Sequence, residues 1–211
     1  MSTQRRIAVL ALAACAVLPL TGCVIEAGDG SSGTGSSTGS ENPDTQGGQD
    51  TTVKAGALTM KLPSSWKARS EGDGRWHVVT RGSCGKSGYP QADTCPGFWI
   101  FGEEDISQGH EMGPYKVSSP YYPASDAQPC PNDPSSLQTM PSAPRKAGLA
   151  PVGSRKANYR EWLFTCKDKT SQVSKDTFVQ RTVYLPVSKL LIVDNWQTPG
   201  LLTNLQNATL A

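Results

Sequence analysis

Histidine is scarce in this chain, and the motifs that usually place a catalytic histidine are missing. The 211 residues contain two histidines, His77 and His110. No G-x-S-x-G sequence marks a serine nucleophile, and His110 is followed by Glu-Met-Gly-Pro, which cannot continue a zinc-binding H-E-x-x-H helix. These absences argue against an enzyme. A cell-envelope hydrolase that uses His77 or His110 is the alternative, since a Ser–His–Asp set can assemble from residues far apart in sequence.

The chain also lacks the common signatures of metal and cofactor sites. No two cysteines have the C-x₂-C spacing of structural zinc sites and thiol redox motifs. No glycine-rich loop has the context of a phosphate-binding site. The acidic run Glu103-Glu104-Asp105 suggests a solvated turn or a helix start rather than a calcium site. We therefore expect neither a metal nor a cofactor.

The apolar run near the N-terminus is too short to cross a bilayer comfortably. It extends from Ile7 to Leu20, whereas a membrane-spanning helix needs roughly 20 apolar residues. Arg5 and Arg6 precede it, which completes the layout of a secretory signal peptide. We expect residues 1–22 to be this signal. The arginine pair leaves open whether export follows the general or the twin-arginine route.

A lipobox follows the apolar run. The sequence Leu20-Thr21-Gly22-Cys23 resembles that of bacterial lipoproteins, in which diacylglycerol is added to the cysteine sulfur and the chain is cut just before it. The resemblance implies that Cys23 is the lipidated N-terminus, carrying diacylglycerol and palmitate. Two or more acyl chains anchor a protein stably. We therefore expect a protein held on the extracytoplasmic face of the cell membrane.

Residues 23–52 form a predicted tether between this anchor and one domain. After Cys23 the segment is dominated by glycine, serine and threonine, and all of its charged residues are acidic. Such a composition predicts disorder. Residues 53–211 have the length of one ordinary domain and a mild excess of lysine and arginine. An envelope protein or a wall polymer suits this location as a partner, and nucleic acid does not.

Four cysteines in the predicted domain indicate disulfides, because we expect the protein to be exported. We favour the pairs Cys84–Cys95 and Cys130–Cys166, since the first pair brackets a short loop containing glycine and proline. The other two pairings stay open. In the chain-entropy model the favoured bridges contribute about 3 and about 4 kcal/mol.

Alternating and β-branched patterns predict a largely antiparallel sheet. The expected strands cover residues 58–62, 76–80, 98–101, 159–166, 177–185 and 190–194. His77 alternates with apolar neighbours and is expected on the outer face of its strand. A single helical turn is expected over 133–140. A closing amphipathic helix is expected after Thr198 as cap and Pro199 as first residue.

The order of these elements resembles a known fold. Residues 58–66 read Leu-x-Met-x-Leu-Pro-x-x-Trp, and antiparallel strands and a final helix follow. This order resembles the PsbP-like α/β/α sandwich, which many actinobacterial surface lipoproteins also resemble. The resemblance implies an α+β fold in which helices flank an antiparallel sheet. It also implies a non-catalytic scaffold for binding or assembly, with no catalytic residues to transfer.

More than half of the 16 prolines lie between Gly113 and Gly153. A stretch this long without regular structure is usually functional or disordered. Tyr115, Tyr121 and Tyr122 lie among these prolines, and tyrosines held by proline make low-entropy contact surfaces. They are the candidate binding surface. The simpler interpretation, which we weigh more heavily, is that the three rings cover the core beneath a long loop.

Overall fold

The computed structural model describes residues 52–72, 74–82, 84 and 95–211. The predicted signal peptide, Cys23 and the predicted tether up to residue 51 lie outside these residues. Two short helices are described, α1 (Glu103–Ser107) and α2 (Leu201–Gln206). Within the described residues, no helix is long and apolar enough to cross a membrane.

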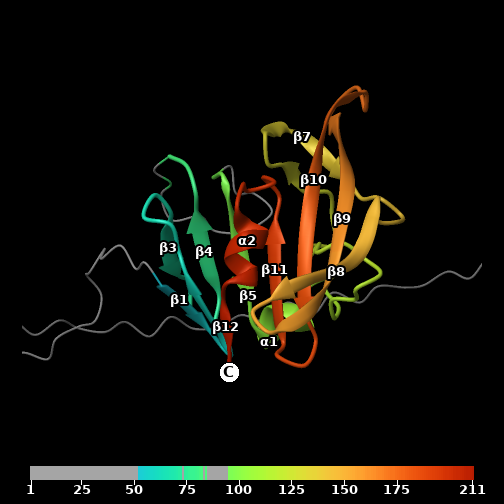
Figure 1. The fold of residues 1–211 in the computed structure, drawn as a ribbon. Coiled ribbons are helices and arrows are strands. Elements are labelled where there is room, and N and C mark those ends of the chain that lie inside the picture. Colours follow the sequence, from blue (N-terminus) through green and yellow to red (C-terminus); the bar gives the residue numbers. More distant parts are fainter. Residues whose placement is uncertain (1–51, 73, 83, 85–94) are drawn as a thin grey trace, which may run out of the picture. The chain divides into compact units, whose positions relative to one another are not determined.

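Antiparallel strands in two sheets are the main regular structure of the described residues (Figure 1). The smaller sheet consists of β1 (Thr52–Ala55), β2 (Leu58–Lys61) and β12 (Thr209–Leu210). The strands of the larger sheet are β3 (Lys67–Ser70), β4 (Trp76–Val79), β5 (Gly97–Phe101), β6 (Pro129–Cys130), β7 (Asp133–Thr139), β8 (Lys146–Val152), β9 (Arg155–Asp168), β10 (Ser174–Leu185) and β11 (Leu190–Asp194). Their order in the larger sheet is β3-β4-β5-β11-β10-β9-β7-β6, and β8 also pairs with β9.

The middle of the larger sheet is buried on both faces, because every residue of β5 and β11 is buried. One face packs on the smaller sheet and on α2; we call it the strand-covered face, and it carries Phe98, Ile100, Leu190 and Ile192. The opposite face packs under α1 and under residues 113–128, which we call the proline-rich segment; the later prolines lie in or between β6, β7 and β8. We call this the loop-covered face, and it carries Trp99, Phe101, Leu191 and Val193. A continuous apolar sequence such as that of β5 is what a strand buried on both faces requires.

All six expected strands are present, so the prediction of a mainly antiparallel fold is confirmed. The helical turn expected over 133–140 is wrong: Asp133–Thr139 is strand β7, and its residues from Ser136 onward pair with β9. The carboxylate of Asp133 accepts hydrogen bonds from Ser135 and Ser136 at the start of the strand. Such local side-chain bonds compete with a helix.

The closing helix is shorter than expected and begins later. Thr198 does not cap it; its hydroxyl and amide instead donate hydrogen bonds to the buried carboxylate of Asp194. The residue before α2 is Gly200, in the left-handed region at φ 78°. At the other end, Thr209 and Leu210 leave the helix to pair with β2 as strand β12. Tertiary pairing therefore overrides the helical periodicity of the last residues.

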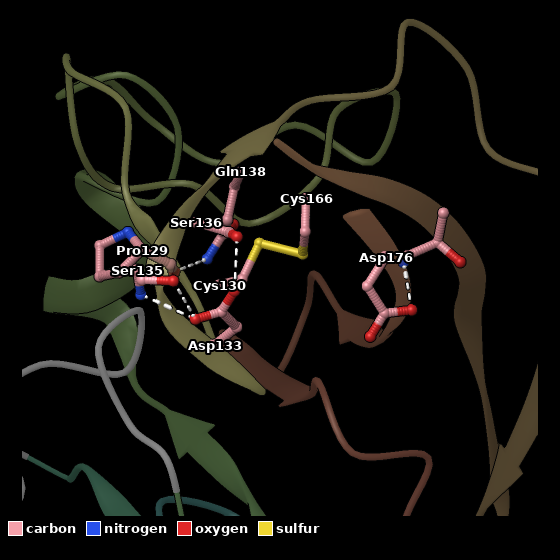
Figure 2. The surroundings of a disulfide bond; sticks show 9 residues. Pro129, Cys130, Asp133, Ser135, Ser136, Gln138, Cys166 and Asp176 are labelled. Carbon is pink, nitrogen blue, oxygen red and sulfur yellow. Dashed lines mark hydrogen bonds between the residues drawn. A yellow bond between two sulfur atoms is a disulfide. The ribbon is translucent and has the colours of Figure 1, made fainter. Parts of the chain in front are cut away.

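Both favoured disulfides are present, and they confirm the predicted pairing. Their Cα–Cα distances are 5.9 Å for Cys84–Cys95 and 6.0 Å for Cys130–Cys166. The second bridge joins the edge strand β6 to β9 (Figure 2). It lies in a cluster with Tyr122 and Phe164 on the loop-covered side of the sheet. This bridge therefore holds the end of the proline-rich cover against the sheet.

Candidate ligand-binding cleft

The three candidate tyrosines are buried rather than exposed. Tyr115, Tyr121 and Tyr122 keep 5, 5 and 4% of their surface accessible. The Tyr115 hydroxyl donates to the Thr182 hydroxyl at 3.2 Å, and burial, the largest effect, raises the Tyr115 pKa to about 12. Their rings cover the core beneath the proline-rich segment, as the simpler interpretation expected. The three rings therefore do not form an exposed surface, and a binding role for them stays a prediction.

A cleft lies beside Tyr121, at α1 and the proline-rich segment. Its volume is about 220 Å³. For scale, an engineered cavity of about 150 Å³ holds a benzene molecule. The cleft is therefore large enough for a small organic ligand. It is lined by Arg75, Glu104, Asp105, Gln108, Met112, Tyr121 and Pro123.

Asp105 is the buried charged residue of this cleft. It comes from α1, and only 7% of its surface is exposed. The guanidinium of Arg75, just before β4, donates to Oδ1 of Asp105. The other oxygen, Oδ2, is buried and has no hydrogen-bond partner among the residues that the structure describes. A buried acceptor left without a donor costs about 1–3 kcal/mol, so an unfilled acceptor needs an explanation.

Tyr121 is held in place at the wall of the cleft. Its ring stacks on Phe101 with a centroid distance of 4.6 Å. Its backbone N–H donates to the side chain of Gln180 at 2.8 Å, and its carbonyl accepts from that amide at 3.0 Å. Burial raises the Tyr121 pKa strongly; the charge of Asp105 adds to this rise and that of Arg75 opposes it. The hydroxyl therefore stays neutral at physiological pH, next to an ion pair.

A strained turn forms the rim. His110 and Gly113 exchange two backbone hydrogen bonds, of 3.0 and 2.8 Å, around Glu111 and Met112. Both central residues have left-handed backbones, with φ of 46° and 63°. This is the pattern of a type I′ turn, which normally uses glycine or asparagine. The Glu111 amide also donates to the Tyr122 carbonyl at 2.7 Å. Held in this way, the turn exposes 62% of Met112 beside the cleft.

The two histidines lie in different settings, and the expectation for His77 is wrong. His77 is 1% exposed, and its ring stacks on Trp99 with a centroid distance of 4.2 Å. The reason is that His77 lies on the same side of the sheet as its neighbour Trp99, a side that is buried at this point. His110 lies in the rim turn, where its Nδ1 is 3.1 Å from the Pro120 carbonyl oxygen. Neither of these contacts is that of a general base with a nucleophile.

No metal site is present in the described ranges: no three or more histidine, cysteine or acidic side chains come together there. The acidic run at 103–105 is the first turn of α1, as the helix-start interpretation expected. Glu103 pairs with Lys189, whereas Asp105 turns to Arg75. Neighbouring acids thus have different partners.

The sequence predicted the start of helix α1, which lines the cleft, but not the ion pair between Asp105 and Arg75. The acidic run indicated a helix start, but Arg75 precedes Asp105 by 30 residues and no local pattern links the two. Asp105 could have been singled out only by knowing that α1 packs over the sheet. The identification of the cleft therefore rests on its own chemistry, because no protein-family model, no curated protein and no solved structure matches this chain.

Proposed function

We propose that this protein is a lipid-anchored, extracytoplasmic binding module without catalytic activity, which takes a small polar component of the cell envelope into the cleft. The observation that carries the proposal is Asp105, buried in a cleft wall with one oxygen bound to Arg75 and the other without a donor among the described residues. A ligand that donates a hydrogen bond would complete this site. A concave site with a few convergent polar groups is the usual form of a small-molecule pocket.

The location in this proposal is supported by the N-terminal sequence and by the disulfides. The lipobox at Cys23 would anchor the chain, and residues 24–52 would act as a tether of roughly 30 Å root-mean-square span. The bridges Cys84–Cys95 and Cys130–Cys166 suit an oxidising compartment outside the cytoplasm. The membrane, reached through the lipid, is then the first partner. A protein or polymer of the envelope would supply the ligand.

The binding function is tested on the mature protein in detergent micelles with a panel of small amines, carboxylates, alcohols and sugars. At least one class should raise the melting temperature, because a ligand that binds only the folded state stabilises it. The exposed Glu104→Lys change at the mouth of the cleft should abolish that rise. Glu103→Gln, on the same helix but outside the cleft, should keep it. A panel without any binder, or a rise unaffected by Glu104→Lys, would refute the proposal.

The anchor is tested separately by mass spectrometry of the protein recovered from bacterial membranes. We expect an N-terminus at Cys23 with acyl chains attached. Cys23→Ala should leave an uncut, unmodified precursor. An unmodified N-terminus in the wild-type protein would remove the anchor from the proposal and leave the cleft untouched.

We propose in addition that the domain is a divergent PsbP-like sandwich. Two contacts support this: Ile106 of α1 packs on the loop-covered face, and Leu201 and Leu205 of α2 pack on the strand-covered face. Helices on both faces of one antiparallel sheet are what that fold requires. An experimental structure that aligns with a PsbP-like protein over the whole sheet would test the proposal, and a different strand order would refute it.

A further inference from the structure

We infer that the ligand of this cleft is a protonated primary amine carried on a short apolar chain. The inference rests on the proposed binding function and adds the chemical class of the ligand. Three properties of the lining residues lead to it: their charge, the kind of hydrogen-bonding atom left open, and the apolar character of the rim.

The charges that line the cleft favour a cation. The lining residues include one basic side chain, Arg75, and two acidic ones, Glu104 and Asp105. The guanidinium of Arg75 is bound to the carboxylate of Asp105, which leaves Glu104 as the excess charge. An anionic ligand would meet two carboxylates and one cation that is already paired. A cation would meet a net negative site, and in a partly buried site that attraction is stronger than in water.

The unpartnered hydrogen-bonding atom calls for a donor, which reaches the buried oxygen when the side chains over it shift on binding. Oδ2 of Asp105 is a buried carboxylate oxygen, which can only accept. An alkylammonium group offers three donors, and two further residues of the lining, Tyr121 and Gln108, carry oxygens that can accept them. Hydrogen bonds between charged partners are about twice as strong as neutral ones. A quaternary ammonium has the same charge but no N–H, so it cannot satisfy this oxygen.

The rim suits a short hydrocarbon chain. Met112 and Pro123 line the cleft and carry no charge, and Met112 is 62% exposed in the strained turn at 110–113. Methionine is flexible and polarisable, so it can adapt to a bound alkyl group. The lining is thus partly anionic, at Glu104 and Asp105, and partly apolar, at Met112 and Pro123. A primary amine with about four carbons likewise has one charged end and one apolar end. It is small enough for a cleft of about 220 Å³.

The test compares four probes with short unbranched alkyl chains and different polar ends by ¹H–¹⁵N NMR titration of the mature protein in micelles. They are n-butylammonium, n-butyltrimethylammonium, n-butanol and butyrate. We expect saturable shifts of the amide signals of Arg75, Asp105 and Tyr121 with n-butylammonium. The quaternary analogue and the alcohol should bind at least about tenfold more weakly, since losing a hydrogen bond to a charged group costs about that factor or more. Butyrate should give no saturable shift.

Variants connect the shifts to the proposed contacts. Asp105→Asn should weaken n-butylammonium binding at least about tenfold. Because that change also disturbs the pair with Arg75, the exposed Glu104→Lys variant provides a second test and should abolish binding. Glu103→Gln is the matched control and should bind as the wild type does. Equal binding of the quaternary analogue, or binding that survives Glu104→Lys, would overturn the inference.

The outcomes separate this inference from the proposed function. If butyrate or butanol binds the cleft as tightly as the amine, the cleft is a binding site but not one for amines. If none of the four probes and no member of the wider panel binds, both the inference and the binding function are refuted.

Discussion

The two faces of the larger sheet are covered in different ways. On the strand-covered face, β1, β2, β12 and α2 provide the cover, and these are regular elements whose backbones pair in a sheet or in a helix. On the loop-covered face, the cover is the short helix α1 and an irregular, proline-rich segment. Irregular backbone cannot be buried unless other groups supply its hydrogen bonds. The loop-covered face therefore depends on individual polar side chains.

Two residues of β10 supply much of this polar support. Gln180, 3% exposed, binds both the amide and the carbonyl of Tyr121. The Thr182 hydroxyl, 1% exposed, lies within hydrogen-bonding distance of the Tyr115 hydroxyl and of Nε1 of Trp162. The same irregular cover contains the strained turn and part of the cleft. The difference between the faces teaches that a regular cover closes its face with ladders and a helix, whereas the irregular cover leaves a cleft.

The largest expected effect comes from the strand-covered face. Phe98→Ala should lower the free energy of unfolding by about 3–5 kcal/mol, because a fully buried ring is replaced by a cavity. Phe98 is 0% exposed and lies edge-to-face with Trp66 at 5.6 Å. Denaturant unfolding followed by tryptophan fluorescence measures the change. Val187→Ala, at an 85% exposed position, is the control and should stay near wild type. A loss below 1 kcal/mol would mean that the face repacks freely.

A slightly smaller loss is expected when the loop-covered face loses its covalent bridge. Replacing Cys130 and Cys166 together by serine should cost about 4 kcal/mol in the chain-entropy model, against about 3 for the Cys84–Cys95 pair, which spans fewer residues. Amide hydrogen exchange should rise first in 114–130 while β2 and β5 stay protected. Equal loss of protection on both faces would show that the two covers unfold as one unit.

The sequence predicted the strand-covered face of the sheet better than the loop-covered face. On the strand-covered side β2 alternates apolar and polar residues, and β5 and β11 are short apolar runs, so these strands could be located from pattern alone. The prediction that His77 lies on an outer face failed because alternation shows which side of a strand a residue takes but not whether that side is covered. Strand β7 was missed because Asp133 and Pro134 suggested the start of a helix, whereas pairing with β9 decides its conformation.

The candidate cleft was even less predictable. The acidic run of α1 was visible as a helix start, but the contact of Asp105 with Arg75 joins separate elements across 30 residues. The tyrosines were visible as a group, yet only Tyr121 reaches the cleft, and it does so as a buried ring. A site between an irregular cover and a strand end has no sequence period, so it becomes visible only when the chain is folded.

An intermediate effect is expected when the polar support of the cover is removed. Gln180→Leu should cost about 1–3 kcal/mol, since it leaves the amide and carbonyl of Tyr121 without partners at a buried position. The loss should be local: exchange at Tyr121 should rise by more than exchange at Ile192 on the strand-covered face. Thr203→Ala on the outer side of α2 is a control and should change neither. If Ile192 lost protection to the same degree as Tyr121, the cover would not be an independent layer.

The smallest effect concerns two surface carboxylates, Asp133 and Asp168, at the edge of the loop-covered side. Figure 2 shows Asp133 beside the Cys130–Cys166 bridge, and Asp168 lies two residues after Cys166. Hydrogen bonds from Ser135 and Ser136 lower the pKa of Asp133 to about 2. The ammonium of Lys175, followed by the amides of the next turn, lowers the pKa of Asp168 below its usual range. A carboxylate with a lowered pKa stabilises the fold above its unfolded value, near 3.9, and loses that contribution as the pH falls through the folded value.

The melting temperature should therefore fall between about pH 4 and pH 2, and Asp133→Asn should flatten this fall because the amide does not titrate in that range. Ser136→Ala should have a partial effect, since it removes one of the donors to Asp133 and keeps the charge. Both carboxylates are at the surface, so the slope should be shallow and should decrease further in high salt. The control against a general acid effect is the core variant Phe98→Ala, which should lower the whole curve without changing its slope. If Asp133→Asn leaves the slope unchanged, then these turns do not contribute to the acid stability of the irregular cover, and only the disulfide and the buried polar side chains distinguish it from the regular one.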